Sequence, residues 1–370
     1  MLNIETVKTK KDFDDFLKLP WKIYKHNKYW VPPLLVDVKS MFNKSKNPFF
    51  QHAEIELFIA RKENEVVGRI VAIVDKNHND YHNEKTGFFG FFEVINDYDV
   101  AKSLLDAAAG WCKKKGMNIL RGPANFSSND EWGLLIEGFD SSPIIMMTYN
   151  PVYYIDLLED YGFKKAKDLF AFYKDTVVDI PERIKRIVEY VKKKENITVR
   201  HINMKHFNRE LGIVKDVYNS AWSKNWGFVP MTNAEMDYLA EKLKPIVVPE
   251  LILFVEIKSQ PAGICLTVPN YNEVLAKING KLNPIGILKF LYYKNKIKDT
   301  RLLALGVKHE FQGKGLNAIM MVEIFNIAKK LGYRGGELSW TLEDNKLINN
   351  DIESTGAKLY KKYRIYGINI

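Results

Sequence analysis

Two hydrophobic patterns alternate along the chain and together predict an α/β protein. Apolar runs of strand length occur in pairs, as in "ELFIARKENEVVGRIVAIVDK" (56–76), where the polar turn at 63–65 predicts a hairpin. Between such runs the apolar residues recur every three or four positions. Val100, Leu104 and Ala108 follow this spacing, which is that of one helix face.

The same order of elements occurs twice, which predicts two copies of one α/β unit. We expect a first domain at residues 1–176, a connecting helical segment at 177–196 and a second domain at 197–370. A chain of 370 residues is long enough to build two hydrophobic cores.

The clearest chemical signal is the glycine-rich turn in "RLLALGVKHEFQGKGLNAIMMVEIFNIAKKLG" (301–332). A strand-like run at 302–307 precedes it, and the apolar residues after it have helical spacing. Gly313 and Gly315 therefore lie at the start of a helix, where backbone N–H groups lack intrahelical acceptors and the helix dipole is positive. With Lys314 between them, the glycines can hold a phosphate, or they can serve only as a tight turn with positive φ.

This turn resembles the cofactor loop of the GNAT superfamily of acyl-CoA-dependent N-acyltransferases. In that family a strand is followed by Gln or Arg, two variable residues, Gly, one variable residue, and Gly or Ala at the head of a helix. Gln312 and Gly315 match this pattern, whereas Asn317 departs from its last position. The resemblance implies tandem GNAT-like domains, each with a mixed, largely antiparallel twisted sheet flanked by helices.

The resemblance also implies a co-substrate, acetyl-CoA or another acyl-CoA. Backbone N–H groups from Gly313 to Asn317 would hold the pyrophosphate, and the strand before the turn would pair with the pantetheine arm. Gly306 would mark the bulge where the family's strands splay, or would pack closely against a neighbouring backbone. The implied cofactor contacts are Leu305, Gly306, Val307, Gln312, Gly313, Lys314, Gly315, Leu316, Asn317 and Asn345.

Acyl transfer to an amine requires a base for the amine and an acid for the leaving thiolate. Glu343 is our preferred base over Glu337, and its alternative role is to cap the next helix. Many GNAT members carry a Tyr acid where this chain has Ile352, so Tyr360 is the nearest substitute by sequence. Its alternative role is packing on a half-buried strand. Trp222, Trp226 and Trp340 are candidates for the wall of an acceptor pocket or for the core.

The first domain lacks a recognisable CoA loop. Its equivalent helix begins "NDYDVAKSLL", with Asp97 and Asp99 where an active copy would carry glycines. Carboxylates suit a helix N-terminus but would repel a pyrophosphate, so we expect one cofactor site per chain. The polar segment at 125–133 is a candidate contributor to the acceptor site.

Composition narrows the class of protein further. The net charge is +10, but lysine runs such as 113–115 lie at predicted helix ends, so we expect no nucleic-acid partner. No uncharged run is long enough to span a bilayer or to form a signal peptide, so we expect a cytoplasmic protein without a membrane partner. Cys112 and Cys265 lie in apolar segments and predict buried thiols, and no metal site is expected.

The connection at 270–300 is longer than a simple link between strands. Its apolar residues suggest a lid or a contact between domains, and contact between domains is the simpler interpretation. They are Ile287, Leu288, Phe290, Leu291 and Tyr292.

The sequence thus predicts an N-acyltransferase that moves an acyl group, acetyl by preference, from acyl-CoA to the amine of a small molecule or peptide. One alternative is an aminoacyl-tRNA-dependent transferase of Fem type, because such enzymes look like paired GNAT domains and this chain is basic. The Gly313–Gly315 loop argues against it. Another alternative is a catalytically silent acyl-CoA-binding protein, which the departures at Asn317 and Ile352 keep open.

Overall fold

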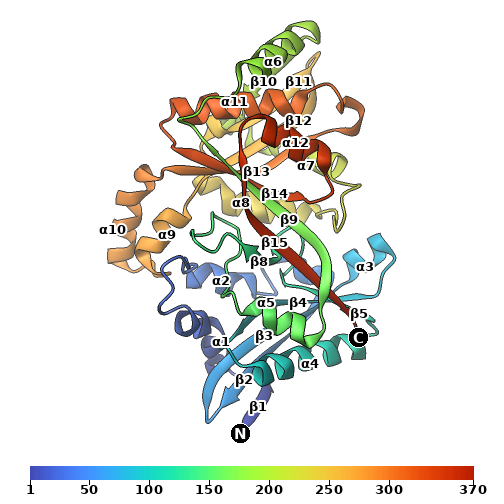
Figure 1. Ribbon diagram of the computed structural model, residues 1–370, viewed down its shortest axis with the longest axis vertical. Coiled ribbons are helices and arrows are strands. Elements are labelled where there is room, and N and C mark those ends of the chain that lie inside the picture. The colour runs from blue at the N-terminus through green and yellow to red at the C-terminus, as the bar shows by residue number, and fades with distance from the viewer. The chain divides into compact units, whose positions relative to one another are not determined.

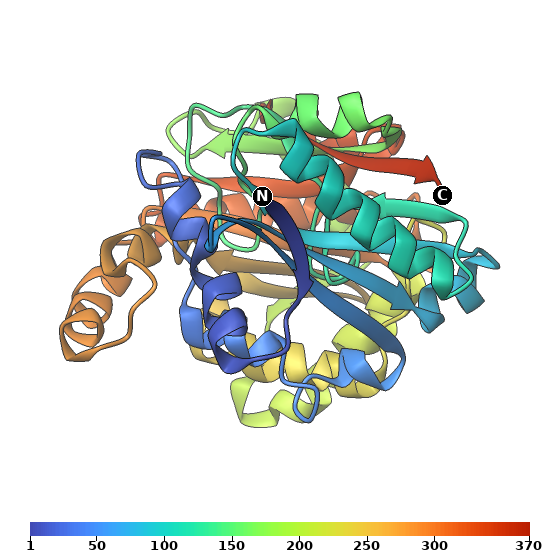
Figure 2. The same ribbon diagram turned by 90° about the horizontal axis from the view of Figure 1, so that it is seen from below.

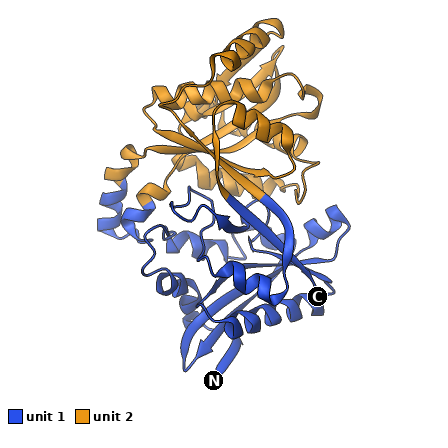
Figure 3. Ribbon diagram, viewed as in Figure 1, with its two compact units in different colours: residues 1–168, 275–290, 362–370 blue, residues 169–274, 291–361 orange.

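The computed structural model describes all of residues 1–370 and divides into two compact units (Figure 3). Unit 1 comprises residues 1–168, 275–290 and 362–370, and unit 2 comprises residues 169–274 and 291–361. Each predicted domain was a single continuous stretch of the chain. The units are not continuous, because strands β9 (Lys164–Asp175) and β15 (Lys358–Asn369) each contribute residues to both (Figure 1).

Unit 1 is built on a mixed sheet in the order β1-β2-β3-β4-β5, to which the end of β15 adds. Strands β4 and β5 are parallel and the other pairs are antiparallel. Its elements are β1 (Leu2–Thr6), α1 (Lys10–Ile23), α2 (Leu35–Met41), β2 (Ala53–Lys62), β3 (Glu65–Asp75), α3 (Lys76–His82), β4 (Thr86–Val94), α4 (Tyr98–Lys114), β5 (Ile119–Gly122), β6 (Ala124–Asn125), β7 (Glu131–Trp132), β8 (Leu134–Glu137) and α5 (Tyr154–Tyr161).

Helix α4 covers one face of this sheet (Figure 2) because one side of the helix is apolar. Val100, Leu104 and Ala108, which the periodicity placed on one helix face, are all fully buried in this core. Cys112 lies in the same core, and burial raises the pKa of its thiol to about 12. It is a free thiol, as predicted, and so is Cys265.

Unit 2 repeats the arrangement with the order β9-β14-β13-β12-β11-β10, in which β13 and β14 are the parallel pair. Its elements are α6 (Glu182–Lys194), β10 (Ile197–His201), α7 (Phe207–Ala221), α8 (Asn233–Leu243), β11 (Ile252–Ile257), β12 (Gln260–Pro269), β13 (Asp299–Val307), α11 (Leu316–Lys330), β14 (Gly335–Leu342) and α12 (Lys346–Ser354); α9 (Asn272–Ile278) and α10 (Pro284–Tyr293) carry residues of both units.

The two faces of this second sheet bury alternate residues of the same strands. Leu253 and Val255 pack with α11, whereas Ile252 and Phe254 pack with α7. This period of two follows from the pleat of a strand. The predicted fold class, tandem units with mixed, largely antiparallel sheets flanked by helices, is confirmed. No helix has the length and apolar character needed to cross a bilayer.

Candidate active site

The parallel strands β13 and β14 separate half-way along their length. They pair from Asp299–Gly335 to Leu302–Leu338 and not beyond. Each strand carries one extra residue immediately after this point: Leu303 is skipped in the pairing of β13 with β12, and Trp340 in the pairing of β14 with β9. A bulge bends its strand, so two bulges at the same level open a V-shaped gap in the sheet.

A cavity with about 580 Å³ of empty space occupies this gap. Residues 302–305 of β13 and 338–342 of β14 form its walls. Trp222 and Asn225 close it from the end of α7, and Asn345, Ile348 and Ile352 close it from α12. Because β13 and β14 do not pair with each other here, the facing backbone edge of β13 can pair with an extended ligand.

The turn between β13 and α11 leaves a helix N-terminus open. Gly313 and Gly315 have φ values of 78° and 72°, and a Cβ on either would meet nothing closer than 3.9 Å. The glycines are therefore needed for backbone conformation and not for close packing. No side chain caps α11, its first turn has no acidic residue, and the N–H groups of residues 313–315 donate to no backbone carbonyl. These N–H groups are available to an anion.

Two side chains shape this turn. The Gln312 side chain donates to the carbonyl of Val307 at 3.3 Å, which ties the turn to the end of β13. Burial raises the pKa of Asp351 on α12, and the nearby side chain of Asn317 partly offsets the rise. Asn317, the residue that departs from the family pattern, thus lies near a carboxyl of the neighbouring helix.

The corresponding helix of unit 1 is already capped. Asp97 accepts a hydrogen bond from the backbone N–H of Val100 at 3.2 Å and forms an ion pair with Lys62. These two interactions lower the pKa of Asp97, so the carboxylate stays charged. A fixed negative charge at this N-terminus opposes a bound phosphate.

In unit 1, the space next to β4 is occupied by other residues of the protein. The backbone N–H of Phe91 donates to Asn125 at 2.7 Å, and a Cβ on Gly90 would lie 1.7 Å from the carbonyl of Ala124. The rings of Phe91 and Phe126 pack with centroids 4.9 Å apart. The segment that includes Asn125 and Phe126 therefore occupies the place that a ligand would need beside β4, and its predicted contribution to an acceptor site stays a prediction.

The predicted bulge does not lie at Gly306. It pairs regularly with Ile264, and the bulge lies three residues earlier, at Leu303. Its missing side chain leaves room for the indole of Trp222, which a Cβ would approach to 2.4 Å. Trp222 and Trp340 line the cavity, as the sequence suggested, whereas Trp226 does not.

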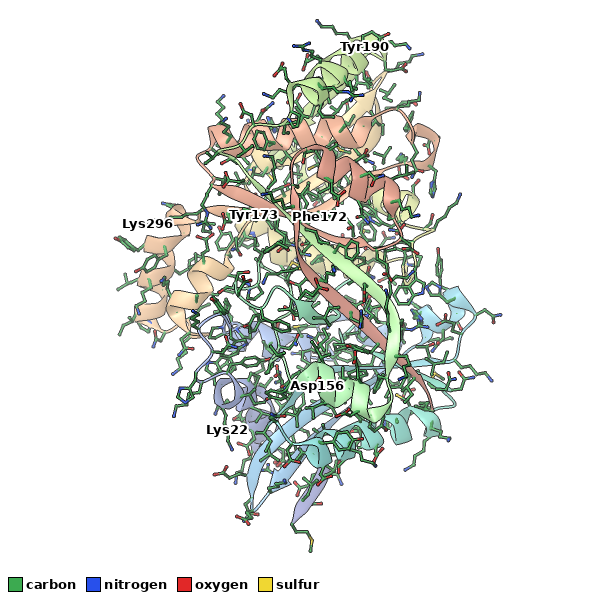
Figure 4. The ribbon with its side chains drawn as sticks, viewed as in Figure 1. Lys22, Asp156, Phe172, Tyr173, Tyr190 and Lys296 are labelled. Carbon is green, nitrogen blue, oxygen red and sulfur yellow. The ribbon has the colours of Figure 1, made fainter.

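A buried polar network lies beside the cavity wall. Glu337 is fully buried, and its carboxylate accepts hydrogen bonds from the hydroxyls of Tyr360 and Ser339. Arg301, also buried, donates to the Ser339 hydroxyl at 3.0 Å. Tyr360 stacks edge-on against Tyr173 of β9, with ring centroids 5.8 Å apart. Tyr173 is labelled in Figure 4. Ser339 lines the cavity, so the network reaches it through this hydroxyl.

Glu343 follows β14 directly and is half-buried. It does not cap α12: Asn345 does, by accepting the backbone N–H of Ile348 at 3.4 Å. Of the predicted site residues, Leu305 and Asn345 line the cavity, whereas Glu343 and Tyr360 do not. The roles of all of them in binding or catalysis stay predictions.

Sequence reasoning missed several residues at the site. Asn225, Ser339 and Thr341 line the cavity, and the ring of His309 lies 3.1 Å from the Ser223 hydroxyl, next to Trp222 in sequence. Ser339 and Thr341 lie on β14 beside Glu337, which the sequence did single out. Nothing in the sequence links Asn225 or His309 to the gap, because the residues that they approach in the folded protein are far away along the chain.

No family profile matches the sequence. Full-length relatives are nevertheless clear. The chain is 37% identical to the bacterial ceramide synthase of Caulobacter vibrioides (strain NA1000 / CB15N), over 99% of this chain and 97% of that protein. It is 33% identical to protein YghO of Escherichia coli (strain K12), over 98% of this chain and 94% of that protein.

Solved structures share the fold over the whole chain. A tandem GNAT protein from the clavulanic acid biosynthesis pathway superposes with a TM-score of 0.59 and 10% identity, over 100% of this chain and 98% of that one. The GCN5-related N-acetyltransferase from Sphaerobacter thermophilus gives a TM-score of 0.52 and 10% identity, over 100% and 95% of the two chains.

The chain belongs to one family with the Caulobacter and Escherichia proteins. The solved structures show that it has the fold of tandem GNAT proteins. Only unit 2 combines an uncapped helix N-terminus with an open gap between its parallel strands.

Proposed function

We propose that this protein is an N-acyltransferase that moves a fatty acyl group from acyl-CoA to the primary amine of a long-chain amino alcohol. A ceramide is the amide of a fatty acid with such an amino alcohol. The relative named as a bacterial ceramide synthase is 37% identical over 99% of this chain, and this observation carries the proposal.

The proposed cofactor site begins at the N-terminus of α11. The N–H groups of residues 313–317 would bind the pyrophosphate, with Lys314 as a nearby cation. The pantetheine arm would then pair with Leu305, Gly306 and Val307, whose edge toward β14 carries no strand partner. Asn345, on the cavity wall, completes the set of proposed contacts.

A second cavity supports a long acyl chain over a short one. It holds about 470 Å³ of empty space and lies between α11 and the parallel strands. Leu302 and Leu338, the last paired residues before the gap, line both cavities. The far side is mostly apolar and includes Met321, Ile324 and Phe325. A thioester held at the gap would have this apolar space immediately behind its acyl group.

In the proposed reaction the amine nitrogen attacks the thioester carbonyl carbon, the C–N bond forms and the C–S bond breaks. Glu343 would accept the proton that the amine loses, since it is half-buried at the end of β14. The departing thiolate takes a proton to give free CoA. Tyr360 stays the proposed acid, although its hydroxyl is held by Glu337, so protonation by water is the competing route.

The test is a matrix of donors and acceptors. The full-length protein is incubated with acetyl-, octanoyl- or palmitoyl-CoA and with a long-chain amino alcohol or a short amine. Thiol release and amide mass are both measured. We expect palmitoyl-CoA with the long-chain acceptor to give the most amide. A preference for acetyl-CoA would overturn the fatty acyl assignment, CoA binding without release would indicate a silent binding protein, and a requirement for charged tRNA would indicate a Fem-type enzyme.

A substitution in the second cavity tests whether this cavity holds the acyl chain. Met321→Trp should narrow the space behind Leu302 and Leu338 and should shift the preference from palmitoyl-CoA toward octanoyl-CoA. Ile319→Trp is an unsuitable control because Ile319 is fully buried elsewhere in the core. Leu347→Trp is suitable, because Leu347 is 81% exposed on α12 and lines neither cavity.

A further inference from the structure

Helix α10 exposes its apolar side to solvent. Six apolar residues form a continuous stripe that covers roughly 160° of the helix circumference at 3.6 residues per turn. They are Pro284, Ile285, Ile287, Leu288, Leu291 and Tyr292. Ile285, Leu288 and Tyr292 are 65%, 68% and 60% exposed. The other side, which carries Gly286 and Phe290, is the one that packs. Of the residues for which the sequence suggested a lid or a contact between domains, Phe290 is half-buried, whereas Ile287, Leu288, Leu291 and Tyr292 are exposed.

Six lysines lie before, within or after the stripe in the sequence. They are Lys277, Lys281, Lys289, Lys294, Lys296 and Lys298. All six are exposed, and none forms an ion pair with a carboxylate. No acidic residue occurs between Glu273 and Asp299. The ammonium group of Lys296, a residue labelled in Figure 4, lies 3.7 Å from the centre of the Tyr292 ring. Positive charge therefore lies directly beside the apolar stripe.

The turn before α10 is held firmly, which fixes how the helix is presented. The indole N–H of Trp21 donates to Asn279 at 3.1 Å, and the backbone N–H of Leu35 donates to the carbonyl of Gly280 at 3.2 Å. A Cβ on Gly286 would lie 2.1 Å from the carbonyl of Lys281, so the first turn of α10 packs closely against the segment that precedes it.

We propose that the stripe of α10, with its surrounding lysines, docks the protein onto the surface of an anionic phospholipid bilayer. Apolar side chains next to unpaired lysines match the boundary between acyl chains and negative head groups. A nucleic acid would satisfy the lysines but would leave the aliphatic side chains exposed to water. A second copy of this chain would bring like charges together.

Surface docking requires no spanning helix. The sequence prediction of no membrane partner rested only on the lack of a run long enough to span a bilayer, and this proposal replaces it. The proposal does not rest on the proposed reaction. It would, however, give an enzyme of this kind direct access to amphiphilic substrates.

Vesicle sedimentation tests the proposal with the full-length protein. Vesicles of phosphatidylcholine alone are compared with vesicles that also contain phosphatidylglycerol, at low and high salt. We expect binding to the anionic vesicles that weakens as salt rises. Ile285→Ser with Leu288→Ser, and separately Lys294→Glu with Lys296→Glu, should each raise the lipid concentration needed for half-maximal binding by ~10-fold or more.

Each double variant has a matched control. Val36 and Val152 are 59% and 57% exposed, so Val36→Ser with Val152→Ser removes exposed apolar surface elsewhere. Lys44→Glu with Lys46→Glu makes the same change in net charge at the same spacing, also on exposed lysines. Both controls should bind vesicles like the unaltered protein.

Three outcomes would overturn the proposal. One is the absence of binding to anionic vesicles at low salt. Another is an equal loss of binding in the control variants, which would assign the attraction to net charge alone. The third is a concentration-dependent dimer that the Ile285→Ser, Leu288→Ser variant abolishes, which would make the stripe an interface between two copies of the chain.

Discussion

The indole of Trp222 occupies the space that a side chain on Gly306 would need. A Cβ on Gly306 would lie 2.4 Å from Cη2 and 2.6 Å from Cζ3 of this ring. Gly306 lies on β13 and Trp222 follows α7, so the glycine lets the helix end approach the sheet closely. Trp222 also lines the cavity, and this contact therefore sets the position of one cavity wall.

Gly306→Ala should therefore displace Trp222 and destabilise the protein by ~1 to 3 kcal/mol, the usual cost of overpacking. Thermal unfolding and intrinsic tryptophan fluorescence measure the two effects. Gly367→Ala is the matched control, because Gly367 also lies in a strand and a Cβ there would meet nothing closer than 3.7 Å. Equal stability of the two variants would contradict the assigned role of Gly306.

Gly315→Glu should abolish acyl-CoA binding while the protein still folds. A carboxylate at the open end of α11 would take the place of the pyrophosphate and repel it. Since φ of Gly315 is 72°, the substitution also adds strain of about 1 to 2 kcal/mol, so the ligand-free variant should melt at a lower temperature. Thermal shift with and without CoA measures both effects.

Gly332→Glu is the control for this strain. Gly332 follows the other end of α11, has φ of 84° and would present its side chain to open space. Its variant should lose similar stability but keep the shift that CoA induces. If Gly315→Glu also keeps that shift, the glycine turn does not hold the phosphate.

CoA should bind at one site per chain. The N-terminus of α11 is uncapped, whereas Asp97 caps α4 and is fixed by Lys62. Asp97→Asn removes the charge but leaves the gap beside β4 filled, so it should create no second site. Isothermal titration calorimetry measures the stoichiometry. Two sites in the unaltered protein, or loss of binding in Asp97→Asn alone, would refute the assignment to unit 2.

Glu343→Gln should slow acyl transfer by ~10²- to 10⁴-fold without weakening CoA binding, because the amide keeps the shape but loses basicity. Steady-state assays of thiol release and a CoA titration separate the two effects. Asp344→Asn, at the neighbouring exposed carboxylate, should leave the rate unchanged. An unaltered rate in Glu343→Gln would exclude Glu343 as the base, and its capping role is already taken by Asn345.

Glu93 should make stability depend on pH. Burial raises the pKa of this carboxyl from 4.5 to about 7, although Arg69 and the Tyr154 hydroxyl at 2.9 Å act in the opposite direction. The folded state therefore binds the proton more tightly than the unfolded state does. The stabilising contribution is complete below about 4.5 and is lost as the pH rises through about 7.

Glu93→Gln removes this titration. The free energy of unfolding of the unaltered protein should fall by on the order of 1 to 3 kcal/mol more than that of the variant across this pH range. Denaturant unfolding at several pH values measures the difference. Parallel curves for the two proteins would show that Glu93 does not titrate differently in the folded state.

The sequence by itself determined the local features of the protein. The spacing of Val100, Leu104 and Ala108 predicted a buried helix face, and the repeat of element order predicted two related units. Gly313 and Gly315 were predicted between a strand and a helix, and both have the positive φ that favours glycine. Periodicity and backbone preference act between residues a few positions apart, so these features can be predicted from a single sequence.

Only the tertiary structure decided which distant residues meet. The contact of Trp222 with Gly306, the hydrogen bond from Tyr360 to Glu337 and the pairing of β9 with β14 join residues far apart in the chain. No short-range pattern encodes such pairings. The same limit explains why Glu343, our preferred base, was named as the alternative cap of the helix that Asn345 caps, and why a contact between domains was the simpler interpretation of the apolar residues of α10. An apolar helix face has the same sequence pattern whether another element covers it or water does, and only the packing of the whole chain distinguishes the two cases.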